Sequence, residues 1–221
     1  MTLAGIVLTI DRDRIADLRI VQGRVVNGEF RRQDPHSSRL AIGPTARSLR
    51  RGEGYITLHQ FLMPSMQVGL TDRESVGAAT PLYFFGERHP FLLTPKVQVL
   101  SRENVKVAAG TIHLMNVGGD RSGLVYGVTT LGSIDNAATI ALGYAFRGHE
   151  RRPIVMLGGE LRESGRVKWF TENWLFGLDN GFVSGGARIL RERFSTELAL
   201  VVPLGIPYGH PAPMINFAWS F

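Results

Sequence analysis

The chain contains no cysteine and no long uninterrupted apolar run. The absence of cysteine excludes disulfide bonds, thiolate catalysis and cysteine-based metal sites. A transmembrane helix needs about 18–20 consecutive apolar residues, and no segment of the 221 residues approaches that length. A helical membrane protein is therefore disfavoured, although the apolar fraction of 44% is ample for a core or a lipid-facing belt.

The chain also lacks a concentrated run of positive charge, although its formal net charge is +6. The arginines are spread over predicted turns and strand ends, as at Arg50, Arg51, Arg147 and Arg191. No basic helix or RNA-binding signature accompanies them. We therefore expect no nucleic-acid partner, and we assign the charge to contact with anionic lipid headgroups or to a solvated surface.

Short polar turns recur about every 30 residues, at 71–74, 102–104, 133–136, 163–165 and 191–193, and Phe221 lies one further interval on. Between the turns lie apolar-rich segments of about ten residues. A transmembrane β-strand needs roughly 9–11 tilted residues. Outer-membrane barrels join such strands by short turns on one side and longer loops on the other. The repeat therefore predicts an outer-membrane β-barrel.

The predicted fold class is all-β, an antiparallel up-and-down transmembrane barrel of about twelve strands. Bacterial single-chain barrels have an even strand number. The predicted strands are 55–63, 66–70, 75–83, 93–101, 105–115, 123–132, 137–146, 153–162, 166–176, 181–190, 194–204 and 213–221. The five polar turns then share one side with both barrel termini. The other side carries the dipeptide Pro64-Ser65 as a very short connection and the loops 84–92, 116–122, 147–152, 177–180 and 205–212.

Apolar and polar residues alternate along the predicted strands, which sends one set outward and the other inward. In the last strand Ile215, Phe217, Trp219 and Phe221 alternate with smaller or polar residues. Aromatic residues also gather at strand ends, as expected for two interfacial girdles. The loop-end girdle is predicted from Phe61, Tyr83, Phe84, Tyr144, Phe146, Trp174 and Phe176, and the turn-end girdle from Tyr55, Trp169, Phe194, Trp219 and Phe221. Shorter strands would be typical of a soluble β-sandwich or barrel, which is the alternative.

Three parts are predicted along the chain: a short β-module at 1–30, which we expect to be truncated, a linker at 31–53 and the barrel at 54–221. Within the module, 5–10, 15–21 and 25–30 are predicted strands, and Asn27-Gly28 is a hairpin turn signal. Residues 1–10 run directly into Asp11 without a basic region or cleavage site. We expect a signal peptide to have been removed or the reading frame to be truncated, with the protein located in the outer membrane.

The closing residues 215–221, INFAWSF, resemble the C-terminal signal of outer-membrane proteins. This resemblance implies recognition of Phe217, Trp219 and Phe221 by the barrel-assembly machinery. Five further stretches resemble uncharacterised outer-membrane β-barrel proteins of environmental bacteria: 34–40 (DPHSSRL), 43–47 (GPTAR), 52–55 (GEGY), 69–72 (GLTD) and 171–174 (TENW). Members of that group often carry a small Sm-like β-module in front of the barrel, to which residues 11–15 would belong.

Several polar side chains fall inside predicted strands, opposite the apolar face. Charges that face lipid at mid-bilayer cost roughly 2–4 kcal/mol for Arg or Lys, so we expect them to point into the lumen. The candidate lumen-lining residues are Lys96, Gln98, Glu160, Arg162, Glu172, Arg188, Glu197 and Asn216. They either fill and rigidify the interior as an ion-pair cluster, or line a polar pore or an ion path.

No catalytic, cofactor or metal site is predicted. The histidines show no metal-binding spacing: they are His36, His59, His89, His113, His149 and His210. No Gly-x-Ser-x-Gly elbow exists, and neither Ser184 nor Ser195 has a histidine nearby in the sequence. The carboxylates of Glu160 and Glu172 are formally available for glycoside chemistry, but nothing fixes their spacing.

A porin-like barrel for small solutes is the leading functional interpretation, with outer-membrane lipid and the assembly machinery as partners. Twelve strands leave room either for a narrow passage or for a plugged lumen. A structural barrel that anchors a periplasmic module is the alternative. A lipid-modifying enzyme and a soluble lipid-binding barrel are further options.

Overall fold

The structure is a computed structural model that describes residues 2–3, 6–7, 23–26, 28–82, 89–115, 121–177, 179–206 and 209–221. All regular elements within these ranges are β-strands. None of the described residues forms a helix long and apolar enough to cross a membrane.

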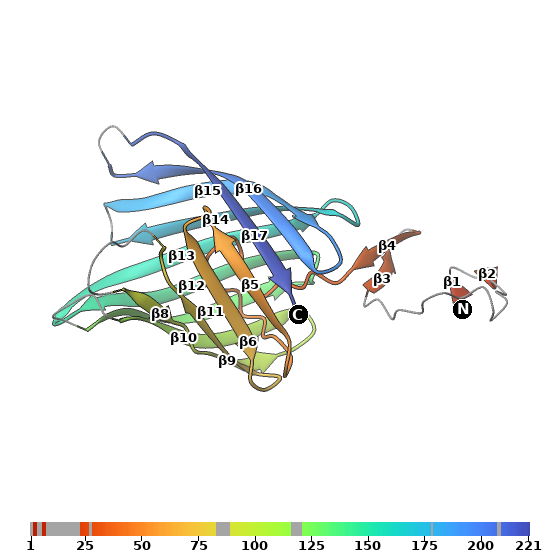
Figure 1. The fold of residues 1–221 in the computed structure, drawn as a ribbon, viewed down its shortest axis with the longest axis horizontal. Coiled ribbons are helices and arrows are strands. Elements are labelled where there is room, and N and C mark those ends of the chain that lie inside the picture. The colour runs from red at the N-terminus through yellow and green to blue at the C-terminus, as the bar shows by residue number, and fades with distance from the viewer. Residues whose placement is uncertain are drawn as a thin grey trace.

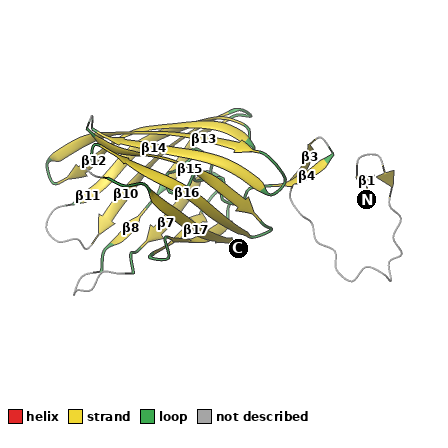
Figure 2. Ribbon diagram, turned by 90° about the horizontal axis from the view of Figure 1, so that it is seen from above, coloured by secondary structure: helices red, strands yellow, loops and turns green. Residues whose placement is uncertain are grey.

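The main sheet closes on itself into an antiparallel barrel (Figures 1 and 2). β17 pairs with β5, and β10 pairs with both β11 and the β8/β9 position. The strands are β5 (Gly54–His59), β6 (Met63–Gly69), β7 (Glu74–Ala79), β8 (Phe91–Leu93), β9 (Lys96–Ser101), β10 (Val105–Met115), β11 (Ser122–Gly132), β12 (Asn136–Arg147), β13 (Glu150–Arg162), β14 (Val167–Phe176), β15 (Asn180–Leu190), β16 (Phe194–Leu204) and β17 (Ala212–Ser220).

β8 and β9 occupy a single position in the barrel, because both pair with β7 and with β10. They are separated at Thr94 and Pro95, and proline has no N–H to donate to a ladder. Thr94 keeps the pairing through two backbone hydrogen bonds with Gly77 (3.2 and 2.8 Å). The predicted closed barrel of twelve antiparallel strands is therefore confirmed.

The first loop-side connection differs from the prediction. Pro64 and Ser65 lie within β6, opposite Leu58 and Thr57, and the turn is made by residues 60–62. Gln60 adopts a positive φ of 52°, and its side chain reaches β17, where it donates to the Pro213 carbonyl (2.8 Å). This bond to the neighbouring strand holds the chain reversal at Gln60, so the proline remains in the strand.

Side chains alternate between the two faces of the wall, as β17 shows. Met214, Asn216 and Ala218 are buried, whereas Trp219 is about half exposed on the outer face. Two residues of the predicted aromatic girdles face inward instead: Tyr55 is 4% exposed and Trp174 is 8% exposed. Each has a polar partner inside the barrel, Ser38 for Tyr55 and Glu172 for Trp174. Tyr83 and Phe84 lie outside the described residues.

Residues 34–49, which we call the internal segment, lie inside the barrel. Leu40 N–H donates to the Gly43 carbonyl (2.8 Å) and Thr45 N–H to the Ser38 carbonyl (3.0 Å), so the segment doubles back on itself. Leu40 and Ala46 are fully buried in an apolar cluster on the inner wall. Gly43 permits this approach, because a Cβ there would lie only 2.4 Å from the Met156 sulfur and 2.9 Å from the Trp174 ring.

A hairpin precedes the internal segment and docks on the turn end of the barrel. It consists of β3 (Gly23–Val26) and β4 (Glu29–Arg32), with Gly28 at a positive φ of 78°. Arg24 pairs with Asp135 of the β11–β12 turn at 2.7 Å. Further toward the N-terminus β1 (Thr2–Leu3) pairs with β2 (Ile6–Val7), and the strand expected at 15–21 lies outside the described residues.

Candidate functional site: the filled barrel lumen

The candidate lumen residues all lie buried inside the barrel, and seven of the eight contact the internal segment or a partner that holds it. They come from six strands: Lys96 and Gln98 on β9, Glu160 and Arg162 on β13, Glu172 on β14, Arg188 on β15, Glu197 on β16 and Asn216 on β17. Arg162 is the exception, because it donates to the carbonyls of Ser164 and Gly165 in the adjoining turn.

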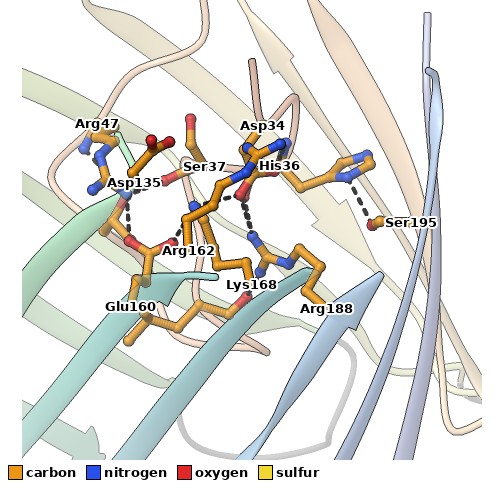
Figure 3. A network of polar contacts seen from close by, with 12 residues as sticks. Asp34, His36, Ser37, Arg47, Asp135, Glu160, Arg162, Lys168, Arg188 and Ser195 are labelled. Carbon is orange, nitrogen blue, oxygen red and sulfur yellow. Dashed lines mark hydrogen bonds and ion pairs between the residues drawn. The ribbon is translucent and has the colours of Figure 1, made fainter. Parts of the chain in front are cut away.

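Asp34 is the centre of a first ion-pair cluster (Figure 3). Its carboxylate accepts from Lys168 Nζ at 2.7 Å and from Arg188 Nη1 at 2.9 Å. Lys168 also donates to Glu160 at 2.9 Å, and Glu160 in turn pairs with Arg47 of the internal segment. Burial by itself would raise the pKa of Asp34, but the positive charges of Lys168 and Arg188 outweigh it and hold that pKa well below its usual value.

A second cluster is centred on Glu197. Arg188 Nε donates to its carboxylate at 2.7 Å, and Arg39 of the internal segment donates at 2.9 Å. Asn216 Nδ2 adds a third hydrogen bond at 2.8 Å. Arg188 links the two clusters and also donates to the Leu40 carbonyl. One arginine of the wall thus binds both acidic groups and the backbone of the internal segment.

The carboxylate of Glu172 binds the tip of the internal segment. It accepts from three consecutive backbone N–H groups, those of Ala41 (2.8 Å), Ile42 (3.0 Å) and Gly43 (2.9 Å). Trp174 Nε1 completes the set at 2.7 Å. A carboxylate that satisfies several backbone donors at once fixes a chain reversal without regular secondary structure.

The opposite wall binds the same segment by its carbonyl groups. Lys96 Nζ donates to the carbonyls of Ser38 (3.0 Å), Thr45 (3.1 Å) and Arg47 (2.8 Å). Gln98 Nε2 donates to the Ala46 carbonyl at 2.6 Å. The internal segment is therefore held by side chains on two opposite sides of the barrel, and it fills the space between them.

Several residues of this network were not among the candidates from sequence. Asp34, Arg39 and Arg47 fall in the stretch expected to be a linker, and Lys168 was not considered. A signal existed for Lys168, because it lies four residues before Glu172 and so shares its face of the strand. No comparable signal existed for Asp34, whose ion-pair partners are more than 130 residues away in the chain.

Ser195 has a histidine partner in space although it has none in sequence. His36 Nδ1 and Ser195 Oγ share a hydrogen bond of 2.8 Å, and His36 Nε2 and Ser220 Oγ share one of 3.0 Å (Figure 3 shows the first). Ser195 is fully buried, and the Asp34 side chain meets the backbone N–H of His36 rather than its ring. The histidine therefore braces the segment between two strands and lacks the carboxylate–imidazole contact of an acyl-transfer triad.

A cavity of about 170 Å³ remains between the internal segment and the wall from β5 to β11. We call it the vestibule. Its lining includes Arg39, Ile42, Tyr55, His59, Lys96 and Tyr126. The hydrogen bond between Ser38 and Tyr55 (3.1 Å) and the contacts of Lys96 join the segment to the wall beside it.

Both ends of the internal segment line one surface hollow at the turn end of the barrel. Its lining includes residues 32–35 on the incoming side and 48–50 on the outgoing side, together with Arg193 and Phe221. The segment therefore enters and leaves through the same mouth. In the part of the chain that the structure describes, no group of three or more His, Asp or Glu side chains is placed to hold a metal ion.

Comparison with known proteins finds similarity of structure only. No protein-family model and no curated protein matches the sequence. Two solved structures are similar: a KdgM porin with a TM-score of 0.59, and a KdgM porin in complex with disordered oligogalacturonate with a TM-score of 0.60. In both, 4% of aligned residues are identical, and the alignment covers 76% of this chain and 98% of the other. The chain therefore has the fold of a porin-type transmembrane β-barrel.

Proposed function

We propose that the protein is an outer-membrane porin-like barrel for small solutes, and that its internal segment closes the passage in the conformation described above. The observation that carries this proposal is that the inner wall is charged and that the lumen is filled by a segment that is not part of the wall. The expected uncharacterised outer-membrane family, with its Sm-like module, belongs to the same proposal.

The chemistry of the inner wall supports a passage. Glu160, Lys168, Glu172, Arg188 and Glu197 all point inward from β13 to β16. A buried ion pair often stabilises a protein no more than apolar packing of the same volume, because both charges must be desolvated. A wall that only had to be stable could be lined by apolar side chains instead. A wall that faces water after the segment leaves has to be polar.

The path of the segment supports its withdrawal. Its two ends share one mouth, so it can leave toward the turn end as a loop while every wall strand keeps its neighbours. The contacts to be broken are mainly ionic and hydrogen-bonded, and water can replace them on both partners.

The outer face supports a membrane location. Large apolar side chains are exposed along the strands, among them Leu142, Leu157 and Leu198, and Trp169 and Trp219 lie near the turn end. An apolar band flanked by aromatic residues suits a bilayer. We therefore propose outer-membrane lipid as a partner, and the barrel-assembly machinery as the reader of Phe217, Trp219 and Phe221.

A second candidate function is a barrel that anchors a periplasmic module. It is favoured by the β3–β4 hairpin, which docks on the turn end through Arg24, Arg31 and Arg32. In that case the filled lumen is permanent, and the internal segment is a structural core.

Conductance in planar bilayers separates the two functions. We expect refolded wild-type protein to be closed most of the time, and a variant whose residues 34–49 are replaced by a short Gly/Ser linker to conduct steadily. Both proteins should migrate anomalously in gel electrophoresis until they are boiled, which reports an intact barrel.

A matched control removes the docked hairpin, residues 23–32, and leaves the internal segment in place. If the internal segment alone closes the passage, this control stays as closed as wild type. A folded barrel without the segment that passes no current would overturn the porin-like proposal in favour of the anchor.

A further inference from the structure

A surface hollow of about 370 Å³ lies beside the turn that joins β12 to β13. It is lined by Val125 of β11, Tyr144 and Phe146 of β12, Gly148 of the turn and Arg151 of β13. The turn lies at the end of the barrel opposite the C-terminus (Figure 1). Val125 and Tyr144 are exposed, so the hollow is open to whatever surrounds the barrel.

The strand register places the hollow on the outer face of the wall. Phe146 lies directly opposite Arg151, and Val125 lies directly opposite Tyr144. Ile154, three residues after Arg151, is buried in the apolar cluster inside the barrel. Because side chains alternate between the two faces of a strand, the residues of the hollow point away from the lumen.

The ring of Phe146 leans over β11 and not over the hollow. A Cβ at Gly123 of β11 would lie only 2.8 Å from Phe146 Cζ. The same ring meets His113 of β10 edge-on, with the ring centres 6.4 Å apart. Because Gly123 has no side chain, the ring can turn away from Arg151, which leaves the space between them open.

Two arginines flank the hollow. Arg151 lines it, and Arg121 lies on its other side, where the Arg121 carbonyl accepts from the N–H of Gly148 (3.0 Å). Both side chains are exposed, and neither makes an ion pair or a hydrogen bond with another described residue. Glu150 is the one carboxylate among residues 121–126 and 144–153, and alternation places it on the lumen side with Ile154. The mouth of the hollow therefore carries unpaired positive charge.

Toward the middle of the barrel the outer face is apolar. Leu142 is exposed there, and it lies opposite Gly127 of β11. A Cβ at Gly127 would meet nothing within 4 Å, so the wall has a shallow place beside Leu142. Charge at the end of the barrel, an aromatic side chain at Tyr144 and an apolar surface beyond it follow the order of a lipid from headgroup to acyl chain.

We propose that this hollow binds a lipid that carries a phosphate group, with the phosphate on the guanidinium of Arg151 and an acyl chain along Val125 and Gly127. The parallel N–H groups of a guanidinium match the oxygens of a phosphate, and Arg121 adds a second positive charge across Gly148. The site deepens the membrane location proposed above and rests on it. Short turns face the periplasm in outer-membrane barrels, so the lipid belongs to the outer leaflet.

Native mass spectrometry with lipid A, a phosphorylated glycolipid, tests the site. We expect the refolded full chain in detergent to retain one molecule of lipid A. Arg151→Gln should lower the retained fraction at least about fivefold, because glutamine has neither the charge nor the paired N–H groups. Arg152→Gln is the matched control: Arg152 is also exposed, but alternation directs it to the lumen side, and retention should stay within about twofold.

Val125→Trp tests the shape of the hollow without changing its charge. Val125 is exposed on the outer face, so the barrel should still fold and migrate anomalously until it is boiled. We expect the larger side chain to fill the hollow and to lower retention of lipid A as Arg151→Gln does. No retention by wild type, unchanged retention in Arg151→Gln or Val125→Trp, or an equal loss in Arg152→Gln would each overturn the site. A dimer that Val125→Trp breaks up, with no lipid A retained, would assign the hollow to a second copy of the chain and would also overturn it.

The site and the membrane location fail in different ways. A barrel that refolds in detergent and migrates anomalously until boiled, but retains no lipid A, would overturn the site and leave the location standing. A chain that is monodisperse without detergent and migrates normally would overturn the location, and the site with it.

Discussion

Lys168 shows at the scale of one residue how the lumen holds its charges. Its side chain has no exposure and lies between two carboxylates, at 2.7 Å from Asp34 and 2.9 Å from Glu160. Desolvation of these groups is offset only while both signs are present. Lys168 therefore matters mainly because its removal would leave two buried carboxylates without their shared cation.

We expect Lys168→Met to lower the free energy of unfolding by about 3–5 kcal/mol, because two buried carboxylates lose a shared cation. Urea unfolding of the refolded protein, followed by tryptophan fluorescence, measures the loss. Lys106→Met is the control: Lys106 donates to the carbonyls of Arg102 and Glu103 at the surface of a turn. That change should cost roughly 0.5 kcal/mol, and equal losses would contradict the role given to Lys168.

His36 makes the docking of the segment sensitive to pH. Burial, followed by the positive charge of Arg39, lowers its pKa to about 3, although Asp34 and Glu197 oppose the shift. Arg188 also disfavours the charged ring, while Ser195, Ser220 and Tyr55 surround it as neutral groups. Between pH 6.5 and about 3 the released histidine binds a proton and the docked one does not, so docking weakens as the pH falls through this range.

We expect the docked state to lose about 2 kcal/mol between pH 7 and pH 5, since each pH unit below 6.5 costs about 1.4 kcal/mol. Single-channel recording at the two pH values measures the change as a larger open fraction at pH 5. His36→Asn removes the titrating group and should flatten this dependence. An open fraction in wild type that is the same at both pH values would refute the assignment.

At the scale of elements, the internal segment depends on close packing at one point. Gly43 sits against Met156, Trp174 and Glu172, and any side chain there must displace at least one of them. Because the tip of the segment is also held by Glu172 through three backbone N–H groups, a displacement at Gly43 breaks those bonds too.

We expect Gly43→Val to release the internal segment from the lumen, while the strands of the barrel stay paired all the way round. Trypsin is a direct probe, because Arg39 and Arg47 are buried in wild type and become cleavable once the segment leaves the lumen. Gly127→Val is the control, since a Cβ at Gly127 meets nothing within 4 Å. Protection of Arg39 and Arg47 in the Gly43→Val variant would show that the packing at this point is dispensable.

At the scale of the whole molecule, the barrel wall and the internal segment that fills its lumen are made by different parts of the chain. The wall closes through the pairing of β17 with β5 and has no free edge, so its backbone hydrogen bonds do not depend on the internal segment. The internal segment is held in the lumen by side chains from β5, β9, β11 and β13 to β17. A folded barrel with an empty lumen is therefore physically reasonable, and a porin-like cycle needs such a state.

The turn end is where the two parts of the molecule meet. The β3–β4 hairpin binds Asp135 and Glu192 in two different turns, and the chain enters the lumen directly after β4. Any pull on the hairpin is therefore transmitted to Asp34, two residues after the end of β4. A force on the N-terminal part of the chain therefore acts directly on the start of the internal segment.

The sequence by itself determined the wall. Turn spacing and period-2 alternation are local properties, so strand number, turn positions and most faces could be read residue by residue, as in β17. The pattern predicted the wrong turn at Gln60 and the wrong face for Tyr55 and Trp174, because each of these side chains makes a specific contact. Gln60 bonds to Pro213 and Tyr55 to Ser38, outside their own strands. Trp174 donates to Glu172 on its own strand, but it also packs against Gly43 of the internal segment, a contact that no local pattern records.

Only the tertiary structure decided what fills the barrel. Residues 34–49 have no periodicity, and their bonds are made across the lumen, as between Asp34 and Lys168, 134 residues apart. Such contacts exist only after the wall has closed and brought β9, β14 and β15 around the segment. The physical reason is that charge pairing in a lumen depends on which side chains the barrel places opposite one another, and barrel closure is a property of the whole chain.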